Sequence, residues 1–390
     1  MGIYKSFVLP TSLLAGTVIG AGIFSLPYVF TQAGVILGFV LLAIFGLVYS
    51  AIHLMYGDLI VKNGDHHRFA GLAKIYFGNY GYWLSVLMTV IEMFFVLTIY
   101  LILSSSFISL IAPNLPVIYQ IAIFWWIGSI IIFSGTRRVA FFEMLAIAGI
   151  LAAIVTVAWL GMPHFFEKSF TFASPSWILW MLPFGALLFA INGRPAIPSV
   201  IHYFRKNGLP PEKSKKPIIW GTLVPVIAYA VFVGGVLGLS GVVTPDAISG
   251  VVREITSPLL ISILAILGIL SLVSSYFAIG LDVFNSLQFD LKFSRKFSMF
   301  LVILLPLFIY FLDLGSFIVL IEIAGGIFIG LEGILILAMW GKMKRGLSQA
   351  GLSEPGMISL KSPVLKIFLY AVFSVSIFYV LASQIFDKVF

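Results

Sequence analysis

The chain alternates between long apolar stretches and short polar connections from one end to the other. Eleven of the stretches come close to or exceed the roughly 20 residues that a helix needs to cross a bilayer. They cover residues 8–32, 35–61, 79–111, 117–134, 139–161, 176–203, 217–240, 256–287, 297–312, 316–340 and 364–386. This pattern predicts an all-α polytopic membrane protein with eleven transmembrane helices in a lipid bilayer.

The amino-acid composition excludes most soluble classes of protein. Of the 390 residues, 61% are hydrophobic and 10% are charged, whereas a soluble domain carries about 25% charged residues. The chain has no cysteine, so disulfides and thiolate metal sites are excluded. No P-loop, metal-ligand cluster or nucleophile–base pair stands in a supporting context. We therefore expect no enzyme activity, no cofactor and no obligate protein partner.

The net charge of +8 comes from alternate connections and does not indicate a nucleic-acid-binding surface. Of the 23 Lys and Arg residues, 19 lie at the N-terminus or in one set of connections. That set comprises residues 62–78, 135–138, 204–216, 288–296 and 341–366. Positive residues accumulate in cytoplasmic loops. We therefore expect a multi-pass protein of the plasma (inner) membrane with a cytoplasmic N-terminus and, because the number of spans is odd, an extracellular C-terminus.

Two connections contain short helical patterns of their own. Residues 69–77 are amphipathic and predict an interfacial helix that leads into the third span. Residues 244–258 begin with Thr, Pro and Asp, which are typical of helix starts. They predict a short external helix or lid.

The first span contains a run that an unbroken helix would not tolerate. Gly16, Gly20, Gly22 and Pro27 fall within twelve residues. Glycine costs about 1 kcal/mol relative to alanine in a helix interior, and proline removes a backbone donor and clashes with the preceding turn. In a membrane, an opened backbone is tolerated only where it faces protein or a watery cavity. The run therefore predicts a broken helix whose exposed amides and carbonyls bind a ligand near the bilayer midplane.

The sixth span carries a matching interruption. Pro198 follows Gly193 by five residues, as Pro27 follows Gly22, and the two motifs are offset by 171 residues. Paired broken helices in two halves of a chain are typical of inverted-repeat transporters. Kinks and close helix packing alone are the simpler alternative, which the coincidence of both breaks with the topology disfavours. The predicted units are a first repeat at 1–161, a second repeat at 162–340, and a linker with one further helix at 341–390.

The motifs in these spans resemble a known family. Gly16-Thr17-x-x-Gly20-x-x-Ile23-x-x-x-Pro27, followed by Gln32-Ala33-Gly34, is similar to the start of the amino acid/auxin permease family, which includes bacterial aromatic amino acid permeases and animal sodium-coupled neutral amino acid transporters. Ala196-Ile197-Pro198-Ser199 in the sixth span, and Ser274-Ser275 with Gly280-Leu281-Asp282-Val283-Phe284 in the eighth, are similar to it as well. The resemblance implies the leucine-transporter five-plus-five fold and uptake of an amino acid coupled to sodium or protons.

The chemistry of the two breaks agrees with an amino acid ligand. A zwitterion needs donors for its carboxylate and acceptors for its ammonium group. The outer half of the first span begins near residues 20–23, where free amides and the helix dipole suit a carboxylate. Carbonyls near residues 16–19 and 189–192 suit an ammonium group or a metal cation. The predicted substrate-binding residues are Thr17, Val18, Gly20, Ala21, Gly22, Phe189, Ala190, Asn192 and Arg194.

The eighth span supplies hydroxyls for a cation. Ser271, Ser274 and Ser275 lie on one helical face because their spacings are three and four. The hydroxyls of Ser274 and Ser275, with carbonyls of Ser271, Gly16 and Ile19, match the sodium site shared across the fold that the resemblance implies. Serine in a membrane helix more often bonds to its own helix, which is the alternative. Proton-coupled relatives can place a lysine from the fifth span in this position. The fifth span here has none, which favours sodium.

Ionisable residues inside membrane spans are functional candidates. They are Glu92, Glu143, Arg194, Asp282, Glu322 and Glu332, with His53 in the second span. Arg194 is unusual, because the family that the chain resembles commonly has an apolar or aromatic residue there. We expect it either to pair with Glu322, Glu92 or a bound anion, or to contact the substrate directly. Glu92 and Glu322 are also the candidate carriers if protons replace sodium.

The sequence as a whole predicts a secondary active transporter that imports an amino acid, neutral or aromatic by preference, through alternating access coupled to a sodium gradient. A proton-coupled amino acid permease is one alternative. A receptor that binds an amino acid on the same fold without moving it is an alternative of another class, since a fold does not settle function.

Overall fold

The computed structural model describes residues 2–64, 68–132, 136–255, 257–350, 356–358 and 362–386, and every regular element in these ranges is helical. The elements are η1 (Tyr4–Val8), α1 (Leu9–Val18), η2 (Ala21–Ser25), α2 (Leu26–Ala33), α3 (Val35–Asn63), α4 (Phe69–Ile111), α5 (Val117–Ile132), α6 (Thr136–Phe165), η3 (Trp177–Met181), α7 (Pro183–Ile191), η4 (Arg194–Ala196), α8 (Ile197–Lys206), η5 (Pro211–Ser214), α9 (Lys215–Leu239), α10 (Ile248–Glu254), α11 (Pro258–Phe289), α12 (Arg295–Phe311), α13 (Phe317–Glu322), η6 (Ile323–Ile329), α14 (Gly330–Gln349) and α15 (Pro363–Phe386).

The helices occupy the predicted spans. Within the described residues, eight helices are long and apolar enough to cross a membrane, and a ninth candidate is the bent pair Tyr4–Val18 and Ala21–Ala33, whose axes differ by 52°. The two remaining predicted spans correspond to α5 and α12, which have 16 and 17 residues. The all-helical membrane architecture is therefore confirmed. The number of eleven spans and the boundaries of the two repeats stay predictions.

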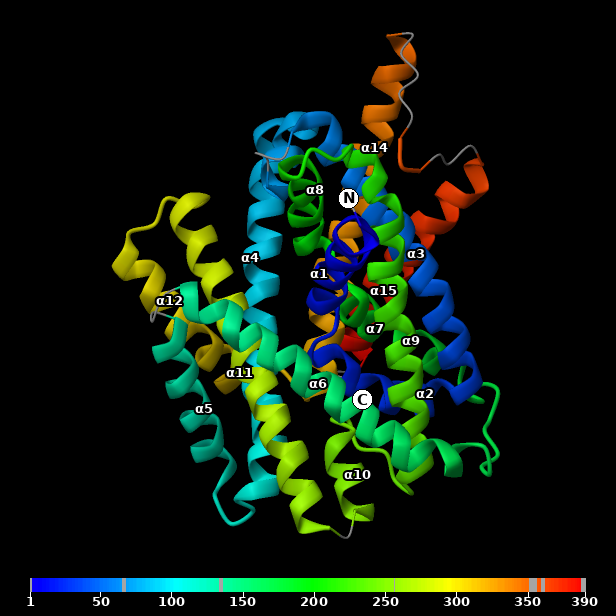
Figure 1. Ribbon diagram of the computed structural model, residues 1–390, viewed down its shortest axis with the longest axis vertical. Coiled ribbons are helices and arrows are strands. Elements are labelled where there is room, and N and C mark those ends of the chain that lie inside the picture. Colours follow the sequence, from blue (N-terminus) through cyan, green and yellow to red (C-terminus); the bar gives the residue numbers. More distant parts are fainter. Residues whose placement is uncertain are drawn as a thin grey trace.

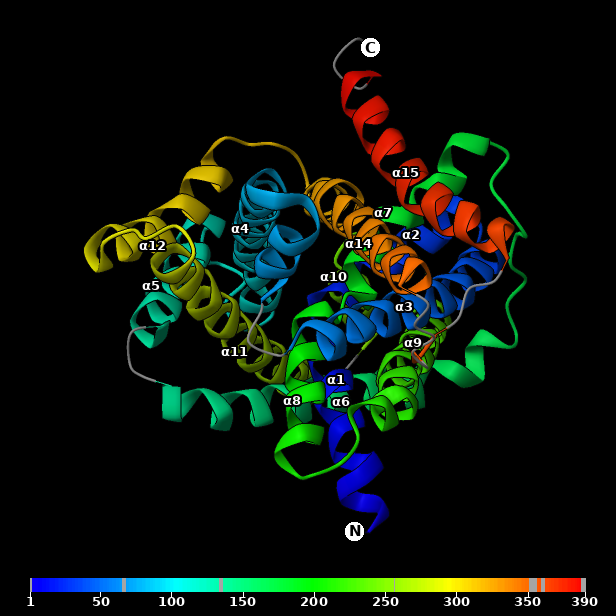
Figure 2. The same ribbon diagram turned by 90° about the horizontal axis from the view of Figure 1, so that it is seen from above.

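The remaining helices group around the interrupted ones. Seen from above, α4, α5, α11 and α12 lie on one side, α3, α9 and α14 lie on the other, and α1 and α8 lie between them (Figure 2). α6 runs obliquely across the molecule and packs along α9 and α11 (Figure 1). α15 packs against α14 at the periphery (Figure 2). The broken segments are therefore supported by helices from both groups.

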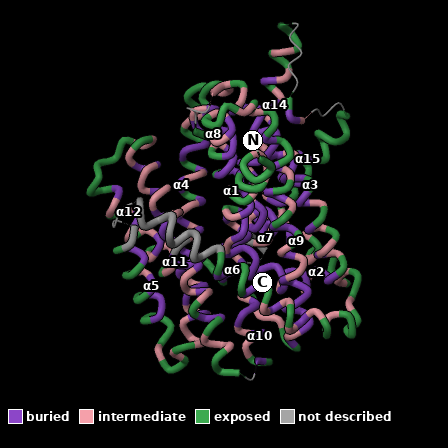
Figure 3. Tube along the Cα trace, viewed as in Figure 1, coloured by how far each residue is buried: buried purple, intermediate pink, exposed green. Residues whose placement is uncertain are grey.

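Burial follows this arrangement. Buried residues concentrate around α7 in the middle of the molecule, and the exposed ones lie on the outer helices (Figure 3). The outward faces carry large apolar side chains, such as Trp159 at 81% exposure and Phe378 at 75%. Water would solvate such a surface poorly, whereas lipid tails match it. The exposed apolar surface thus agrees with the hydropathy pattern.

Both predicted connection helices are present. α4 includes the segment predicted to be interfacial, and Gly78 separates that segment from the long helix that follows, with φ of 66° and ψ of −157°. Glycine adopts this left-handed region without the penalty that a side chain would bring. In the external connection, α10 begins at Ile248, after an Asp246 carboxylate that accepts bonds from the Ser249 backbone and hydroxyl.

The connections that are rich in Lys and Arg gather at one end of the molecule. The start of α4, the end of α8, the end of α14 and the connection between α11 and α12 lie toward the top of Figure 1, whereas α10 lies at the bottom. At the basic end, the Asp58 carboxylate accepts the Met357 amide at 2.6 Å and Trp340 Nε1 at 3.1 Å. This buried aspartate ties the linker before α15 to α3 and α14.

The basic end should face the cytoplasm, and cysteine labelling can test this because the native chain has no cysteine. We expect an impermeant maleimide added to intact cells to label Val242→Cys, since Val242 is 69% exposed beside α10. Asn207→Cys, also exposed but at the end of α8, should react only after the membrane is permeabilised. The reverse pattern would invert the predicted orientation.

Candidate functional site

The first break is a local loss of helical backbone between α1 and η2. Ile19 takes ψ of 103°, and Gly20 is fully extended at φ −150° and ψ −158°. In the sixth predicted span, Asn192 takes ψ of 108° between α7 and η4. Both interruptions therefore fall at the Gly and Pro motifs that predicted them.

The two breaks contact each other reciprocally. A Cβ atom on Gly22 would lie 2.6 Å from Cα of Ala190, next to the second break. A Cβ atom on Gly193 would lie 2.6 Å from Val18 Cγ2, next to the first. These distances are shorter than packed carbon atoms allow. At Gly22 the collision would be with backbone, which cannot yield easily, whereas at Gly193 the neighbouring side chains would have to shift. The paired glycines that mark the two motifs in the sequence thus allow the breaks to meet.

A cavity of about 590 Å³ lies against both breaks. Its lining includes all nine residues predicted to bind the substrate: Thr17, Val18, Gly20, Ala21, Gly22, Phe189, Ala190, Asn192 and Arg194. α4 and α11 supply the opposite walls, including Glu92, Tyr100, Ser275 and Asp282. The structure thus gathers the predicted substrate-binding residues around one space, although their binding role stays a prediction.

The predicted sodium ligands are only partly gathered. Gly16, Ile19 and Ser275 line the cavity. Ser271 is buried at 2% exposure and is not part of the lining, and the side chain of Ser274 lies outside the described part of the structure. The Tyr100 hydroxyl lies beside the first break, 3.5 Å from where a Cβ atom on Gly20 would stand, and Tyr100 lines the same cavity as Ser275.

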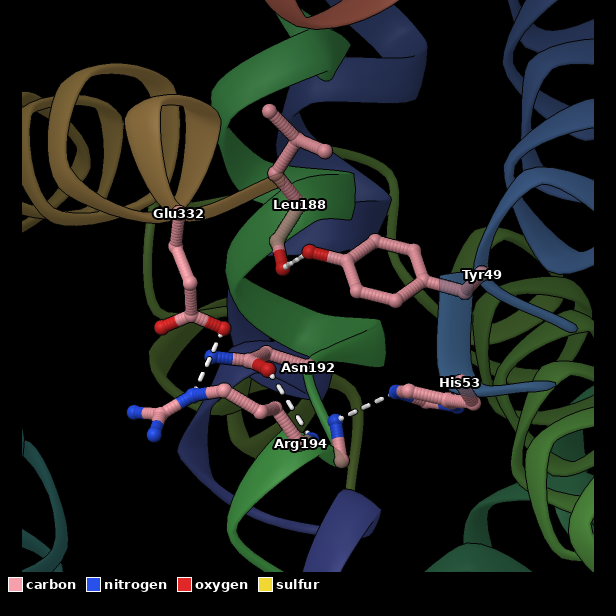
Figure 4. A network of polar contacts seen from close by, with 7 residues as sticks. Tyr49, His53, Leu188, Asn192, Arg194 and Glu332 are labelled. Atoms are coloured by element: carbon pink, nitrogen blue, oxygen red, sulfur yellow. Dashed lines mark hydrogen bonds and ion pairs between the residues drawn. The ribbon is translucent and has the colours of Figure 1, made fainter. Parts of the chain in front are cut away.

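Tyrosine hydroxyls satisfy several carbonyls that the breaks leave open. Tyr49 on α3 donates to the Leu188 carbonyl at 2.6 Å (Figure 4). Tyr229 on α9 lies 2.6 Å from the Val18 carbonyl and 2.9 Å from the Ala190 carbonyl. Buried carbonyls without a donor are costly, so these contacts stabilise both interrupted ends.

His53 on α3 forms a hydrogen bond to the backbone of the second break (Figure 4). Its Nε2 accepts the Gly193 amide at 3.2 Å. Its Nδ1 lies 2.8 Å from the Thr222 hydroxyl, which itself donates to the Ile218 carbonyl. Nδ1 must therefore carry the proton, and the imidazole is neutral with both nitrogens satisfied. The buried histidine caps an amide that the break leaves open.

Arg194 forms a buried ion pair, as one expectation had it, but with an acid that was not among the expected partners. Its Nε lies 2.7 Å from Glu332 Oε1, and both side chains are buried (Figure 4). The guanidinium also lies 4.7 Å from the centre of the Phe69 ring. Glu322, one of the expected partners, lies one helical segment earlier, before the π-helical turns of η6. Arg194 still lines the cavity, so pairing and an electrostatic effect on a ligand are compatible.

Two polar residues of this site, Tyr100 and Tyr229, were not recognised from the sequence, although Glu332 was noted there as an intramembrane acid. Both tyrosines stand in otherwise apolar helices. A buried tyrosine needs a partner for its hydroxyl, and this is the signal that could have drawn attention to Tyr100 and Tyr229. Asp282 and Glu92, by contrast, were noted as intramembrane acids, and both line the cavity.

Access to the cavity lies toward the basic end. A second cavity of about 320 Å³ shares Arg194, Ser199 and Asp282 with the first and extends to Arg68 and Asp290. These last two are 3.6 Å apart. Partial burial raises the pKa of the Asp290 carboxyl, an effect that nearby Arg68 opposes. Beyond the first break, Phe24 is buried in edge-to-face contacts with Phe107 and Phe232.

Solved structures share this architecture across nearly the whole chain. They include Mhp1, a nucleobase-cation-symport-1 family transporter, in a closed conformation with bromovinylhydantoin bound, at TM-score 0.63 and 16% identity over 96% of this chain and 91% of that chain. MhsT in complex with L-phenylalanine matches at TM-score 0.58 and 16% identity over 98% of both chains. A manganese transporter of Eremococcus coleocola matches at TM-score 0.62 and 11% identity over 98% of this chain and 86% of that chain. At these identities the likeness shows the fold alone, which is the leucine-transporter fold.

Comparison at the level of sequence families is more specific. No curated protein matches the chain. The amino acid/auxin permease family, which the motifs resemble, is not confirmed by name. Instead, the model of the tryptophan/tyrosine permease family matches residues 4–360. This match spans most of the chain, including both breaks and the cavity between them, and the chain belongs to the tryptophan/tyrosine permease family.

Proposed function

We propose that this secondary transporter imports an amino acid, with neutral or aromatic side chains preferred, by alternating access coupled to a sodium gradient. The observation that carries the proposal is the single cavity against both helix breaks, with backbone amides of one break and carbonyl ends of two helices around it. A zwitterion needs both kinds of group within one small space.

The polarity of the breaks gives the ligand an orientation. η2 begins at Ala21, and backbone amides at a helix start favour a carboxylate. α1 and α7 end at Val18 and Ile191, and their carbonyl ends favour an ammonium group. Tyr100 adds a hydroxyl beside the first break. Phe189, Met93 and Val96 provide apolar lining for a side chain, in agreement with the aromatic ligands in the family's name.

Alternating access requires a site that opens to one side of the membrane at a time. The two cavities share lining residues and extend to Arg68 and Asp290 at the basic end. We infer that the packed rings of Phe24, Phe107 and Phe232, here called the Phe24 cluster, close the other side. If the basic end is cytoplasmic, this structure corresponds to the inward-facing state. Import would then follow from an opposite state in which the Phe24 cluster separates and the second cavity closes.

Coupling to sodium is supported by the oxygen atoms around the first break. Sodium is a hard cation that prefers oxygen ligands, and Ser275 lines the cavity together with Gly16 and Ile19. Ser271 is buried outside the cavity lining, so the proposed ion depends most on Ser275.

A proton-coupled permease is the second candidate, and Glu92 favours it. This carboxyl is buried at 8% exposure and lines the cavity. A buried carboxyl inside a membrane protein is a typical proton carrier. Glu322, the other predicted carrier, is not among the residues that line either cavity.

Counterflow in proteoliposomes tests the proposal. Vesicles loaded with unlabelled L-tryptophan should accumulate labelled L-tryptophan, and a competition series of all twenty amino acids should rank the substrates. Empty liposomes and vesicles containing Gly22→Leu protein serve as controls, because a side chain at Gly22 would collide with Ala190. Saturable binding without any counterflow would instead support the receptor alternative. Absence of both for every amino acid would reject an amino acid substrate.

A further inference from the structure

Tyr229 is the one side chain of the described chain that bonds to carbonyls at both helix breaks. It stands on α9, is fully buried, and places its hydroxyl 2.6 Å from the Val18 carbonyl and 2.9 Å from the Ala190 carbonyl. Val18 is the last residue of α1, and Ala190 lies in the last turn of α7. The backbone of Gly20 also interacts with this hydroxyl. A single oxygen atom therefore lies at the junction of the two interrupted helices.

The electrostatics of this junction explain why a donor is needed there. The carbonyl end of a helix carries a partial negative charge, and two such ends meet at Tyr229. A phenol has one proton to donate, and both distances are in the hydrogen-bond range. The proton can serve either carbonyl, so one hydroxyl is within hydrogen-bond distance of both helix ends.

We propose that Tyr229 is a positioning residue that holds the two breaks in a fixed position relative to each other. The affinity for a ligand bound at one break then depends on the position of the other break. The close approach of Gly22 to Ala190 and of Gly193 to Val18 supports this independently, because the two breaks are packed directly against each other. This inference rests on the proposed function only for the identity of the ligand. The mechanical link itself does not depend on it.

Tyr229→Phe removes the hydroxyl and retains the ring, and Tyr49→Phe is its matched control. Tyr49 is also buried and also donates to a carbonyl of α7, at Leu188, but it touches one break only. Both variants leave a buried carbonyl without its donor, so both should lose thermal stability to a similar degree. Only Tyr229→Phe should disturb the relation between the breaks.

Hydrogen exchange measures this relation without any ligand. In Tyr229→Phe, amides of residues 19–23 and of residues 192–196 should both exchange faster, on the order of tenfold, because the loss of one buried hydrogen bond corresponds to about that factor. In Tyr49→Phe, only the second segment should change. Acceleration at a single break in Tyr229→Phe, or at neither, would overturn the proposal even if no amino acid binds.

Binding of L-tryptophan gives the second readout. We expect Tyr229→Phe to raise its dissociation constant about tenfold, and Tyr49→Phe to leave it within about twofold. Equal affinities in the two variants, with equal losses of stability, would reduce Tyr229 to a structural role and reject the inference. If wild-type protein binds no amino acid at all, the proposed function fails, and the exchange experiment alone decides the link between the breaks.

Discussion

Arg194→Ala is expected to lower the free energy of unfolding by about 3–5 kcal/mol, because it leaves the buried Glu332 carboxylate without its countercharge. Arg194 and Glu332 are 7% and 4% exposed, and their closest atoms are 2.7 Å apart. Glu332 Oε2 has no hydrogen-bond partner among the described residues, so no other group compensates for the loss of Arg194. Thermal unfolding in detergent, with and without substrate, measures the effect.

Restoring charge balance should recover most of that loss. Arg194→Ala combined with Glu332→Gln removes both charges, and we expect its stability to approach that of Glu332→Gln alone. Arg194→Ala combined with Glu322→Gln is the matched control, because Glu322 stands on the neighbouring segment of the same span and is also buried. Rescue by the Glu322 substitution and not by that of Glu332 would contradict the observed pairing.

The same variants test whether Arg194 contributes to substrate selectivity in addition to stability. If Arg194 acts only through its ion pair, the double variant should rank amino acids as wild type does. If its guanidinium also contacts the ligand, the double variant should rank acidic amino acids lower than wild type does. Arg194→Lys should change the ranking as well, because lysine lacks the planar, bidentate guanidinium group. If the double variant and Arg194→Lys both rank amino acids as wild type does, the role of Arg194 is the ion pair with Glu332 alone.

The breaks were predictable from sequence because glycine and proline alter the backbone wherever they stand. Gly22 and Gly193 marked both interruptions, and every residue predicted from them to contact the substrate lines the cavity. The paired breaks and the loop charges predicted an inverted-repeat membrane transporter, and the resemblance of the motifs to a known family implied the leucine-transporter fold. These features depend on local backbone chemistry and on the bilayer, both of which can be read residue by residue.

The pairing of side chains across helices was not predictable in this way. Glu322 and Glu332 are equally acidic and lie in one predicted span, and their order along the chain does not say which faces Arg194. The π-helical turns of η6 lie between them and change the rotation of the helix from one acid to the other. Tyr229 was missed for a related reason, since only the packing of α9 against α1 brings its hydroxyl to the breaks.

Ser275→Ala should weaken the sodium dependence of transport by about tenfold or more, because an oxygen that binds a charged group contributes about 1.5–3 kcal/mol. The measurement is the sodium concentration that gives half-maximal uptake into proteoliposomes at fixed pH. Ser262→Ala is the matched control on the same helix, since Ser262 lines neither cavity. By linkage, substrate should raise the affinity for sodium by the same factor as sodium raises the affinity for substrate.

Glu92→Gln separates the two coupling ions in the same assay. If sodium drives transport, this variant should keep its sodium dependence, because Glu92 is not one of the proposed ligands. If protons drive transport, wild-type uptake should follow an imposed pH gradient with or without sodium. Glu92→Gln should then lose accumulation while retaining counterflow, because exchange of bound substrate needs no net proton movement. Glu92 and Ser275 line the same cavity from two different helices, so either could couple an ion to the same substrate. The proton-driven pattern would reject the sodium site at Ser275 and assign coupling to the buried Glu92 carboxyl of α4.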